Sequence, residues 1–278
     1  MSVATVDNPE QTRPVGPLLK WTGGKRQILK HLLPLLPGAF RKYYEPFFGG
    51  GALFFALRPR MSVLSDKNPD LINCYAQVRD YPKDVILALR EWPNTEADYY
   101  SVRRLVPENP VEQAARTIYL TRLSFNGIYR LNAKGEFNVP YGHRTHLNPC
   151  EPQRIRVISK ILKRAVLQCE DFEASIDGIR RGDVVYFDPP YAGPKDRTRF
   201  VRYNDRNYTW DDQVRLAGLA GRLRDRGVAV LVSNAPDPEI TALYHDFACL
   251  TFNRNSSVAA DGAQRGPTAE CIFYNPVP

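Results

Sequence analysis

The sequence predicts an α/β fold in which a mostly parallel, Rossmann-like sheet is flanked by helices and interrupted by an inserted segment. Short apolar runs of β-branched and aromatic residues, typical of buried strands, alternate with longer helix-like stretches. This alternation is typical of parallel sheets with helices on their faces. A basic, glycine-containing region breaks it in the middle of the chain. The 278 residues, 43% of them hydrophobic, are enough for a sizeable core.

The elements can be assigned in chain order from their patterns. Residues 1–16 are polar and lack the apolar run of a signal peptide, so a loose tail is expected there. Thr209 is placed to cap the last long helix, since threonine is a favoured N-cap. The expected helices span 52–57, 71–78, 83–91, 111–123 and 210–226, and the expected strands include 165–168, 184–187 and 228–232.

The tetrapeptide Asp188, Pro189, Pro190 and Tyr191 follows directly after an expected buried strand. Two prolines end the strand, which holds the acid at the carboxyl end, where open α/β sheets bind ligands. A carboxylate and a carbonyl that both accept from the exocyclic amine of a nucleobase would make its nitrogen more electron-rich, and an aromatic ring would hold the base by stacking. The alternative is an ordinary turn, since Asp and Pro favour turns.

Two glycine-rich segments, 20–25 and 45–51, lie near the N-terminus. A phosphate-binding P-loop ending at Lys25 would need glycine in place of Leu19 and Ser or Thr in place of Arg26. A dinucleotide fingerprint beginning at Gly49 would need glycine in place of Phe54. ATP and NAD are therefore disfavoured as ligands.

The second glycine segment joins a short apolar stretch to a helix, and Asp66 follows the next expected strand. Glycines let a ligand approach the backbone, and an acid at the end of the next strand can accept from both hydroxyls of a ribose. A cofactor with a ribose and no required phosphate fits S-adenosylmethionine. Capping of the following helix is the alternative role of Asp66, and the two roles are compatible.

The formal charge of the chain is +8, and it is unevenly distributed. Residues 101–160 contain ten Lys or Arg and four Glu, a net +6. A basic surface attracts polyanions such as nucleic acid, although a charge cluster is often only a solvated face.

Within the basic segment, residues 125–132 and 137–142 flank a glycine-containing turn and predict a hairpin. A β-ribbon of this kind can enter the major groove, where an arginine pairs bidentately with guanine. Arg130 is the candidate for this contact.

Five motifs in this order resemble the Dam-type DNA adenine-N6 methyltransferases, over about residues 18–274. The motifs are Lys-Trp-Thr-Gly-Gly-Lys, Glu-Pro-Phe-Phe-Gly-Gly-Gly, Ser-Asp-Lys-Asn, Phe-Asn-Gly-Ile-Tyr-Arg and Asp-Pro-Pro-Tyr. The resemblance implies a class I methyltransferase sheet, S-adenosylmethionine as methyl donor, double-stranded DNA as partner and transfer to N6 of a flipped-out adenine in GATC.

The resemblance also implies roles for individual residues. Asp188, Pro189, Pro190 and Tyr191 would be catalytic. The implied cofactor-binding residues are Trp21, Lys25, Phe47, Gly49, Gly51, Asp66, Asp171, Phe172 and Asp188, with Asp66 on the ribose and Asp171 and Phe172 on the adenine ring of the cofactor.

Other positions are implied to bind DNA. Ile128, Arg130 and Pro140 would read GATC, and Phe125 and Asn126 would lie near the flipped adenine, although Phe125 and Ile128 are equally compatible with packing. The polar loop 253–257 is expected to contact the DNA backbone. The remaining implied contacts are Lys20, Asn132 and Arg265.

The expected surroundings are those of a bacterial enzyme. Five cysteines without metal-ligand spacing and without a signal segment suggest reduced thiols, the cytoplasm and no metal. No run approaches the roughly 20 apolar residues of a membrane span. We expect a nucleoid-associated monomer, with a cognate restriction endonuclease as a candidate partner.

The expected organisation is a tail at 1–16, a catalytic S-adenosylmethionine-binding domain from 17–74 and 161–278, and a target-recognition domain at 75–160. Cytosine-N4 and RNA adenine methyltransferases would share the Asp-Pro-Pro-Tyr signature, and the recognition segment argues against them. A non-catalytic DNA-binding relative could lose Asp188, Gly49 or Asp66, and all three are present. Phe200, Tyr203, Tyr208 and Trp210 would either close over the target pocket or pack on the sheet.

Overall fold

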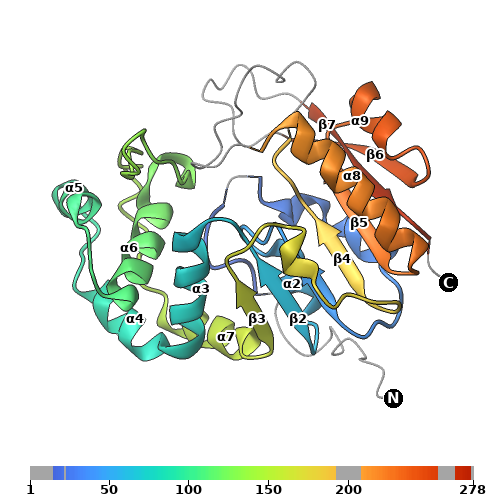
Figure 1. Cartoon of the computed structure of the whole chain (residues 1–278). Helices are drawn as coiled ribbons and strands as arrows, with labels where there is room; N and C mark the ends of the chain where they lie inside the picture. Colours follow the sequence, from blue (N-terminus) through green and yellow to red (C-terminus); the bar gives the residue numbers. More distant parts are fainter. Residues whose placement is uncertain (1–14, 22, 192–207, 256–266, 277–278) are drawn as a thin grey trace.

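The computed structural model describes residues 15–21, 23–191, 208–255 and 267–276, and these form a seven-stranded sheet with helices on both faces (Figure 1). The strand order is β3-β2-β1-β4-β5-β7-β6. Strands β1 to β5 pair in parallel, and β7 runs antiparallel to β5 and β6. The strands are β1 Tyr43–Glu45, β2 Ser62–Ser65, β3 Ala165–Gln168, β4 Val184–Phe187, β5 Ala229–Asn234, β6 Ala248–Asn255 and β7 Pro267–Tyr274.

The central strand β4 is buried on both faces, which explains its uninterrupted apolar sequence. Successive side chains of a strand point to opposite faces. Val184 and Tyr186 therefore enter the core on one side of the sheet, and Val185 and Phe187 enter the core on the other. The predicted α/β class is confirmed, and so is the strand 184–187.

One face of the sheet is covered by α8 and α9, whose apolar side chains share the core of Val185 and Phe187. The predicted cap of α8 is confirmed: Thr209 Oγ1 accepts from the backbone N–H of Asp212, and the Asp212 carboxylate accepts from the N–H of Thr209. The opposite face is covered by α1 and α2. The bounds are α1 Leu29–Leu32, α2 Ala52–Leu57, α8 Trp210–Asp225 and α9 Pro238–Leu243, with 3-10 turns η2 Lys25–Ile28, η3 Leu33–Leu35 and η5 Ala174–Ile176.

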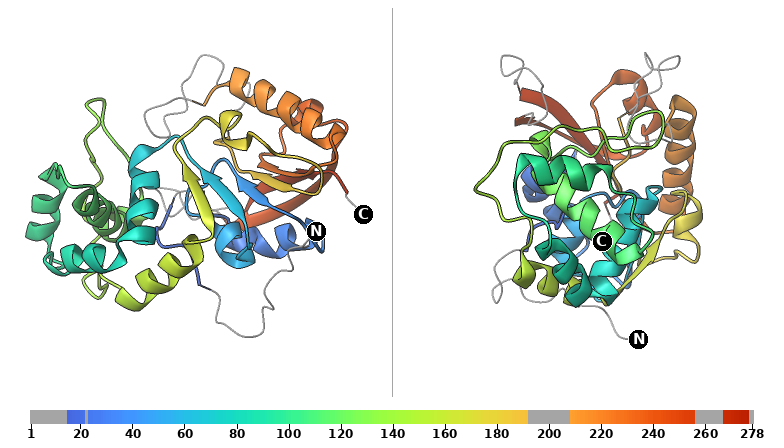
Figure 2. Two further views of the ribbon diagram at one scale, coloured as in Figure 1. Left: turned by 60° about the horizontal axis from the view of Figure 1, so that its bottom comes forward. Right: turned by 90° about the vertical axis from the view of Figure 1, so that its left-hand side faces the viewer.

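Helices α3 to α7 form a bundle beside the sheet. In the right-hand view of Figure 2 this bundle faces the viewer. Asn68, rather than Asp66, caps α3, because its side chain accepts from the N–H groups of Asp70 and Leu71. The expected domain boundaries at 74/75 and 160/161 fall inside α3 and α7, so the division into domains stays a prediction. The bounds are α3 Pro69–Asp80, α4 Pro82–Arg90, α5 Glu96–Arg104, α6 Pro110–Leu123 and α7 Pro152–Leu162, with η4 Phe125–Gly127.

Several elements were not expected from the sequence, namely α1, α5, α7, α9 and the pair β6 and β7. The polar loop predicted at 253–257 is wrong for residues 253–255, which belong to β6. In the described part of the chain, no helix combines the length and apolar character needed to cross a membrane.

The topology brings the site residues to one edge of the sheet. The parallel strands β1, β2 and β4 end there, since parallel neighbours point the same way. Strand β7 begins at the same edge, because it is antiparallel and Cys271 pairs with Asn234 at the end of β5. Residues from the start of β7 can therefore meet residues that follow β4.

Candidate active site

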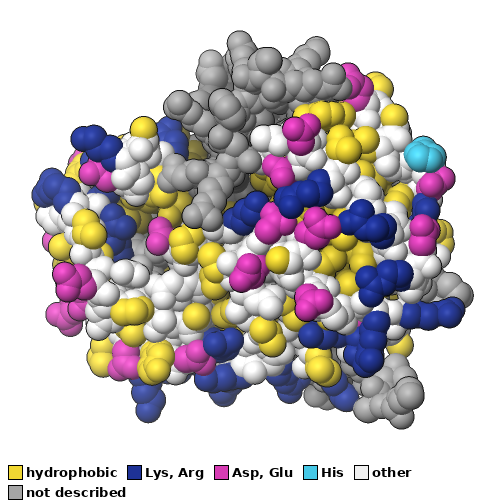
Figure 3. Space-filling view, in the orientation of Figure 1, with side chains coloured by type: hydrophobic (Ala, Val, Ile, Leu, Met, Phe, Trp, Pro, Cys, Tyr) yellow, Lys and Arg dark blue, Asp and Glu magenta, His cyan; other side chains and the backbone are white. Residues whose placement is uncertain are grey.

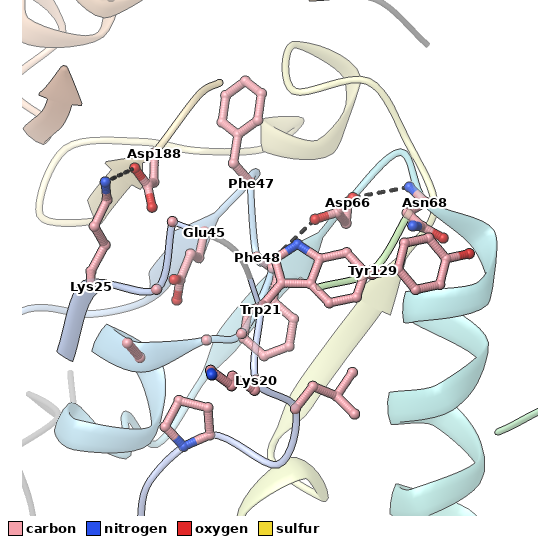
Figure 4. A pocket seen from close by; sticks show the side chains of 18 of the residues that line it. Lys20, Trp21, Lys25, Glu45, Phe47, Phe48, Asp66, Asn68, Tyr129 and Asp188 are labelled. Carbon is pink, nitrogen blue, oxygen red and sulfur yellow. Dashed lines mark hydrogen bonds and ion pairs between the residues drawn. The ribbon is translucent and has the colours of Figure 1, made fainter. Parts of the chain in front are cut away.

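A cavity of about 1010 Å³ opens at the carboxyl edge of the sheet. Residues of all five motifs line it, although these motifs are spread from residue 20 to residue 191. Figure 4 shows Lys25 and Asp188 on one side of the cavity, and Trp21, Asp66 and Tyr129 on the other. The fold thus brings residues of the five motifs together around one cavity.

Asp66 is fixed by two backbone donors at the end of β2. Its Oδ2 accepts from the N–H of Gly49 at 3.0 Å and its Oδ1 from the N–H of Asn68 at 3.0 Å. Burial raises the pKa of Asp66, and these two hydrogen bonds oppose that rise. A carboxylate has about four acceptor positions, so each oxygen retains capacity for a ligand hydroxyl.

Gly49 brings the first two motifs together. Its φ of +46° is in the left-handed region, which favours glycine, and an added Cβ would lie 3.0 Å from Trp21 Cδ1. The Trp21 ring stacks on Tyr129, with 5.0 Å between centroids and 28° between planes. An aromatic wall therefore stands beside Asp66.

Phe172 and Asp171 have different surroundings. Phe172 is buried, lines the cavity and stacks on Phe47 with centroids 5.4 Å apart. Asp171 is outside the cavity lining, and its carboxylate binds Arg215 through both oxygens and Lys67 at 2.6 Å. Burial opposes ionisation of Asp171, but the bonds from Arg215 and Lys67 outweigh it and hold the pKa below its ordinary value. Only Phe172 of this predicted pair faces the cavity.

Lys25 connects the first and last motifs. Its Nζ lies 3.1 Å from Asp188 Oδ1, 2.8 Å from Glu270 Oε1 and 2.6 Å from the Tyr191 hydroxyl oxygen. Tyr191 in turn donates to Glu270 Oε1 at 2.5 Å. Burial, followed by the Asp188 and Glu270 carboxylates, raises the pKa of Tyr191 well above its ordinary range, so its hydroxyl remains a donor.

Glu45 is a second buried carboxyl group on this side. It accepts a hydrogen bond from the Tyr43 hydroxyl at 2.9 Å. Burial raises the pKa of Glu45 well above its ordinary range despite that bond. A carboxyl group in this environment favours its neutral form and packs as part of the floor of the cavity.

The predicted hairpin is present, although it is not a regular ribbon. Its two arms pair through the bridges Ser124–Tyr141 and Leu131–Phe137, and a 3-10 turn interrupts the first arm. Asn126, in that turn, has a φ of +54°, which is rare for a residue with a side chain. Such strained positions occur preferentially at functional sites.

The predicted DNA-binding residues divide between the cavity and the exposed hairpin. Asn126 and Ile128 line the cavity with Lys20, whose pKa is lowered by burial and by Arg144. Ile128 also packs against the core, which supports the alternative that it is a packing residue. Phe125 is 45% exposed, which argues against that alternative for Phe125.

The hairpin carries the remaining described candidates. Arg130 is exposed, and its Nε donates to Asn138 Oδ1 at 2.7 Å. Asn132 holds the turn by accepting from the N–H groups of Lys134 and Glu136. Pro140 is exposed. Arg265, Phe200 and Tyr203 lie outside the described residues.

Three residues of the site were not singled out from the sequence. Tyr129 and Glu45 lie inside recognised motifs, so their motif membership was an available signal. Glu270 was detectable only as a lone acid in the apolar run of β7. Within the described residues, no group of three or more His, Cys, Asp or Glu side chains is placed to hold a metal ion.

The strand order with an antiparallel β7 is that of a class I methyltransferase, and S-adenosylmethionine is the methyl donor of the family that the chain matches. The model of the family of D12 class N6 adenine-specific DNA methyltransferases matches residues 21–258. The chain belongs to this family, its substrate is DNA, and it methylates adenine at N6.

Curated relatives agree with this membership. The chain is 38% identical over 269 residues to the type II methyltransferase M1.LlaDCHI of Lactococcus lactis subsp. cremoris, covering 93% of this chain and 95% of that protein. It is 37% identical to the type II methyltransferase M.MjaIII of Methanocaldococcus jannaschii, covering 80% and 84%. It is 32% identical to the DNA adenine methylase of Escherichia coli strain K12, covering 93% and 95%.

Proposed function

We propose that this DNA adenine methyltransferase acts site-specifically on GATC, on an adenine that is flipped out of the duplex. The observation that carries the proposal is the position of Asp188. It lies in one cavity with Asp66 and Trp21, which are proposed to bind the cofactor, and with Asn126 in the 3-10 turn at the base of the hairpin. Cofactor, catalytic acid and recognition element are thereby brought within reach of one another.

S-adenosylmethionine would bind on the side of the cavity that is lined by the two glycine-rich segments, 20–25 and 45–51. Asp66 would accept from the ribose hydroxyls, since its carboxylate is already aimed by two backbone donors. Trp21 and Phe172 would contact the adenosine portion, and the positive φ of Gly49 and Gly51 lets the backbone pass close to the methionine portion. Bound there, S-adenosylmethionine supplies a methyl group already activated by its sulfonium.

Asp188 and the carbonyl of Pro189 would accept hydrogen bonds from the N6 amino group of the target adenine. These contacts localise the nitrogen lone pair and stabilise the positive charge that grows on N6. Tyr191 would stack on the base. Because the methyl group would pass directly from the sulfonium to N6, no covalent enzyme intermediate is required. The surplus proton of N6 leaves to water after transfer.

Base flipping is proposed because Asp188 is recessed, with its side chain only 20% exposed. An adenine stacked in a duplex cannot bring N6 to such a position without leaving the helix. Phe125, exposed in the 3-10 turn at the base of the hairpin, is the candidate to fill the space that the adenine vacates.

Recognition of GATC is proposed for the hairpin. Asn138 holds the Arg130 guanidinium, because its side-chain oxygen accepts from Nε at 2.7 Å and its backbone oxygen accepts from Nη2 at 3.4 Å, which leaves the Nη1 side for another partner. A fork oriented in this way is suited to O6 and N7 of guanine in the major groove. In Figure 3, Lys and Arg side chains lie over the end of the molecule around α5, along its lower edge and over its right-hand part, where Asp and Glu lie among them. Basic side chains of this kind would attract DNA nonspecifically.

A single chain is proposed to suffice for activity. The relatives include proteins named type II methyltransferases and others named DNA adenine methylases. A cognate restriction endonuclease therefore stays a proposal, to be tested by co-purification.

The test uses purified protein, labelled S-adenosylmethionine and matched duplexes that differ only in the presence of GATC. We expect label in N6-methyladenine from the GATC duplex and little from the other. Equal labelling of both duplexes would refute the proposed sequence specificity. Label in N4-methylcytosine would refute the assigned base.

A further inference from the structure

Glu270 occupies a place that the reaction alone does not explain. It belongs to β7, its side chain is 1% exposed, and it is not part of the cavity lining. A buried carboxylate is costly unless it is paired and hydrogen-bonded. Its Oε1 accepts hydrogen bonds from the Lys25 ammonium at 2.8 Å and from the Tyr191 hydroxyl at 2.5 Å.

The order of burial shows how this cluster is arranged. The exposed fractions of the side chains are 1% for Glu270, 5% for Lys25 and 20% for Asp188. Asp188 and Lys25 both line the cavity, and Glu270 lies behind them. An ammonium has three donors, and three oxygens of Asp188, Glu270 and Tyr191 lie within 3.1 Å of Nζ.

Lys25 thus has its donors committed to protein oxygens, which leaves little capacity for the cofactor contact implied for it by family resemblance. Its Nζ is also 4.5 Å from the centroid of the Tyr191 ring. One ammonium consequently fixes both the carboxylate that would face N6 and the ring that would stack on the base.

We propose that Glu270, acting through Lys25, is a positioning residue for methyl transfer; this inference rests on the catalytic roles proposed above for Asp188 and Tyr191. Glu270 fixes the Lys25 ammonium and the Tyr191 hydroxyl in one place. It also divides the positive charge of Lys25 between two carboxylates. The cluster of one ammonium and two carboxylates carries a net charge of −1, so Asp188 keeps negative charge to offer the nitrogen that becomes positive.

The chain topology provides this arrangement through β7, which runs antiparallel to both of its neighbours in the sheet. Because β7 is antiparallel to β5, its early residue Glu270 is carried to the edge where β4 ends and Asp188 begins the catalytic loop. A seventh strand parallel to β5 would place its early residues at the opposite edge. The link between β7 and Lys25 thus joins the two ends of the chain at the site.

The substitution Glu270→Gln tests the proposal, because it keeps the shape and a carbonyl acceptor while removing the charge. We expect the single-turnover rate of methyl transfer to fall by about 10–100-fold, the usual loss when a residue that orients a contacting side chain is replaced. The dissociation constants for S-adenosylmethionine and for the duplex should change by less than about two-fold. Glu270→Asp, which restores the charge with a shorter reach, should recover part of the rate.

Glu239→Gln is the matched control, since Glu239 is exposed on α9 and is expected to leave the rate unchanged. If Glu270→Gln does not fold, Tyr191→Phe tests the same network, because it removes the hydroxyl bonded to Lys25 and Glu270 and keeps the ring. We expect that variant to lose about ten-fold in rate at unchanged DNA affinity.

The outcomes separate this inference from the proposed function. Normal methylation by the wild type together with a normal rate for folded Glu270→Gln, or for Tyr191→Phe in its place, overturns the inference and leaves the function intact. A Glu270→Gln variant with a normal rate and weakened cofactor binding also overturns it. An inactive wild type refutes the proposed function and the inference with it, whereas a wild type active at another sequence refutes only GATC.

Discussion

The substitution Asp66→Asn tests the cofactor side of the site most sharply. In the wild type, both carboxylate oxygens accept from backbone N–H groups, of Gly49 and of Asn68, each at 3.0 Å. An asparagine offers only one oxygen, so its NH2 group would face one of these donors. The substitution therefore removes the negative charge and also disturbs the orientation of the side chain.

The expected size of the effect follows from the hydrogen bonds to the ribose. A hydrogen bond to a charged group contributes about 1.5–3 kcal/mol. Loss of one such bond and weakening of a second amount to roughly 3 kcal/mol, or about 100-fold in the dissociation constant for S-adenosylmethionine. Titration calorimetry measures this constant, and Asp84→Asn, on the exposed first turn of α4, is the control.

The pH dependence of S-adenosylmethionine binding tests the role of Asp66 in a second way. Burial raises the pKa of Asp66 above 3.8, and the ribose contacts require the ionised carboxylate. Acidification should therefore weaken cofactor binding at a higher pH than for an ordinary aspartate, and Asp66→Asn should lack this dependence. An affinity of Asp66→Asn within two-fold of the wild type, or the same pH profile in both proteins, would refute the assignment of Asp66 to the ribose.

Three further expectations concern recognition and stability. Arg130→Ala should relax discrimination at one base pair by about 1–3 kcal/mol, whereas Arg265→Ala should weaken binding to all sequences and flatten its salt dependence; identical specificity profiles for the two variants would contradict the distinction. Thr209→Ala removes the cap of α8 and should lower the free energy of unfolding by about 1 kcal/mol in urea titrations, and an unchanged midpoint would be evidence against the cap. Asp171 has a lowered pKa in the folded protein, so its ionisation stabilises the fold above its ordinary value of 3.8, and this contribution is lost as the pH falls through the lowered folded value. Arg215→Met should reduce that acid-dependent loss of stability, and an unaltered pH profile of unfolding would argue against the ion pair.

The elements with strong local signals were predictable from the sequence. The apolar run of β4 followed by two prolines located the central strand and the point where it ends. Thr209 and Asp212 have the spacing of a capping box, and the structure contains that box. Local chemistry alone decides these features, so no knowledge of distant contacts was needed.

The elements that were missed depend on weaker patterns or on tertiary contacts. Helix α5 buries only Tyr99 and Val102, so its apolar stripe is too narrow to distinguish it from a polar loop. Helix α7 buries Ile155, Ile158 and Leu162 at helical spacing, and this spacing in the sequence is a signal from which the helix could have been predicted. These helices complete the bundle that supports the hairpin.

The site was predictable as a set of motifs but not as a network. Motif order placed Asp66, Asp188 and the hairpin in one site, and the cavity contains residues of all five motifs. The pairing of Lys25 with Glu270 joins residues 245 positions apart, and the antiparallel direction of β7 creates it. The clamp of Arg215 on Asp171, which keeps that carboxylate out of the cavity, is likewise visible only in the folded chain.

The most direct test of the catalytic assignment is the single-turnover rate of Asp188→Ala on a GATC duplex with saturating labelled S-adenosylmethionine. Loss of the hydrogen-bond acceptor for N6 should abolish transfer to adenine, while equilibrium binding of the cofactor and the duplex stays measurable. A rate close to that of the wild type would contradict the role of Asp188 and the mechanism built on it.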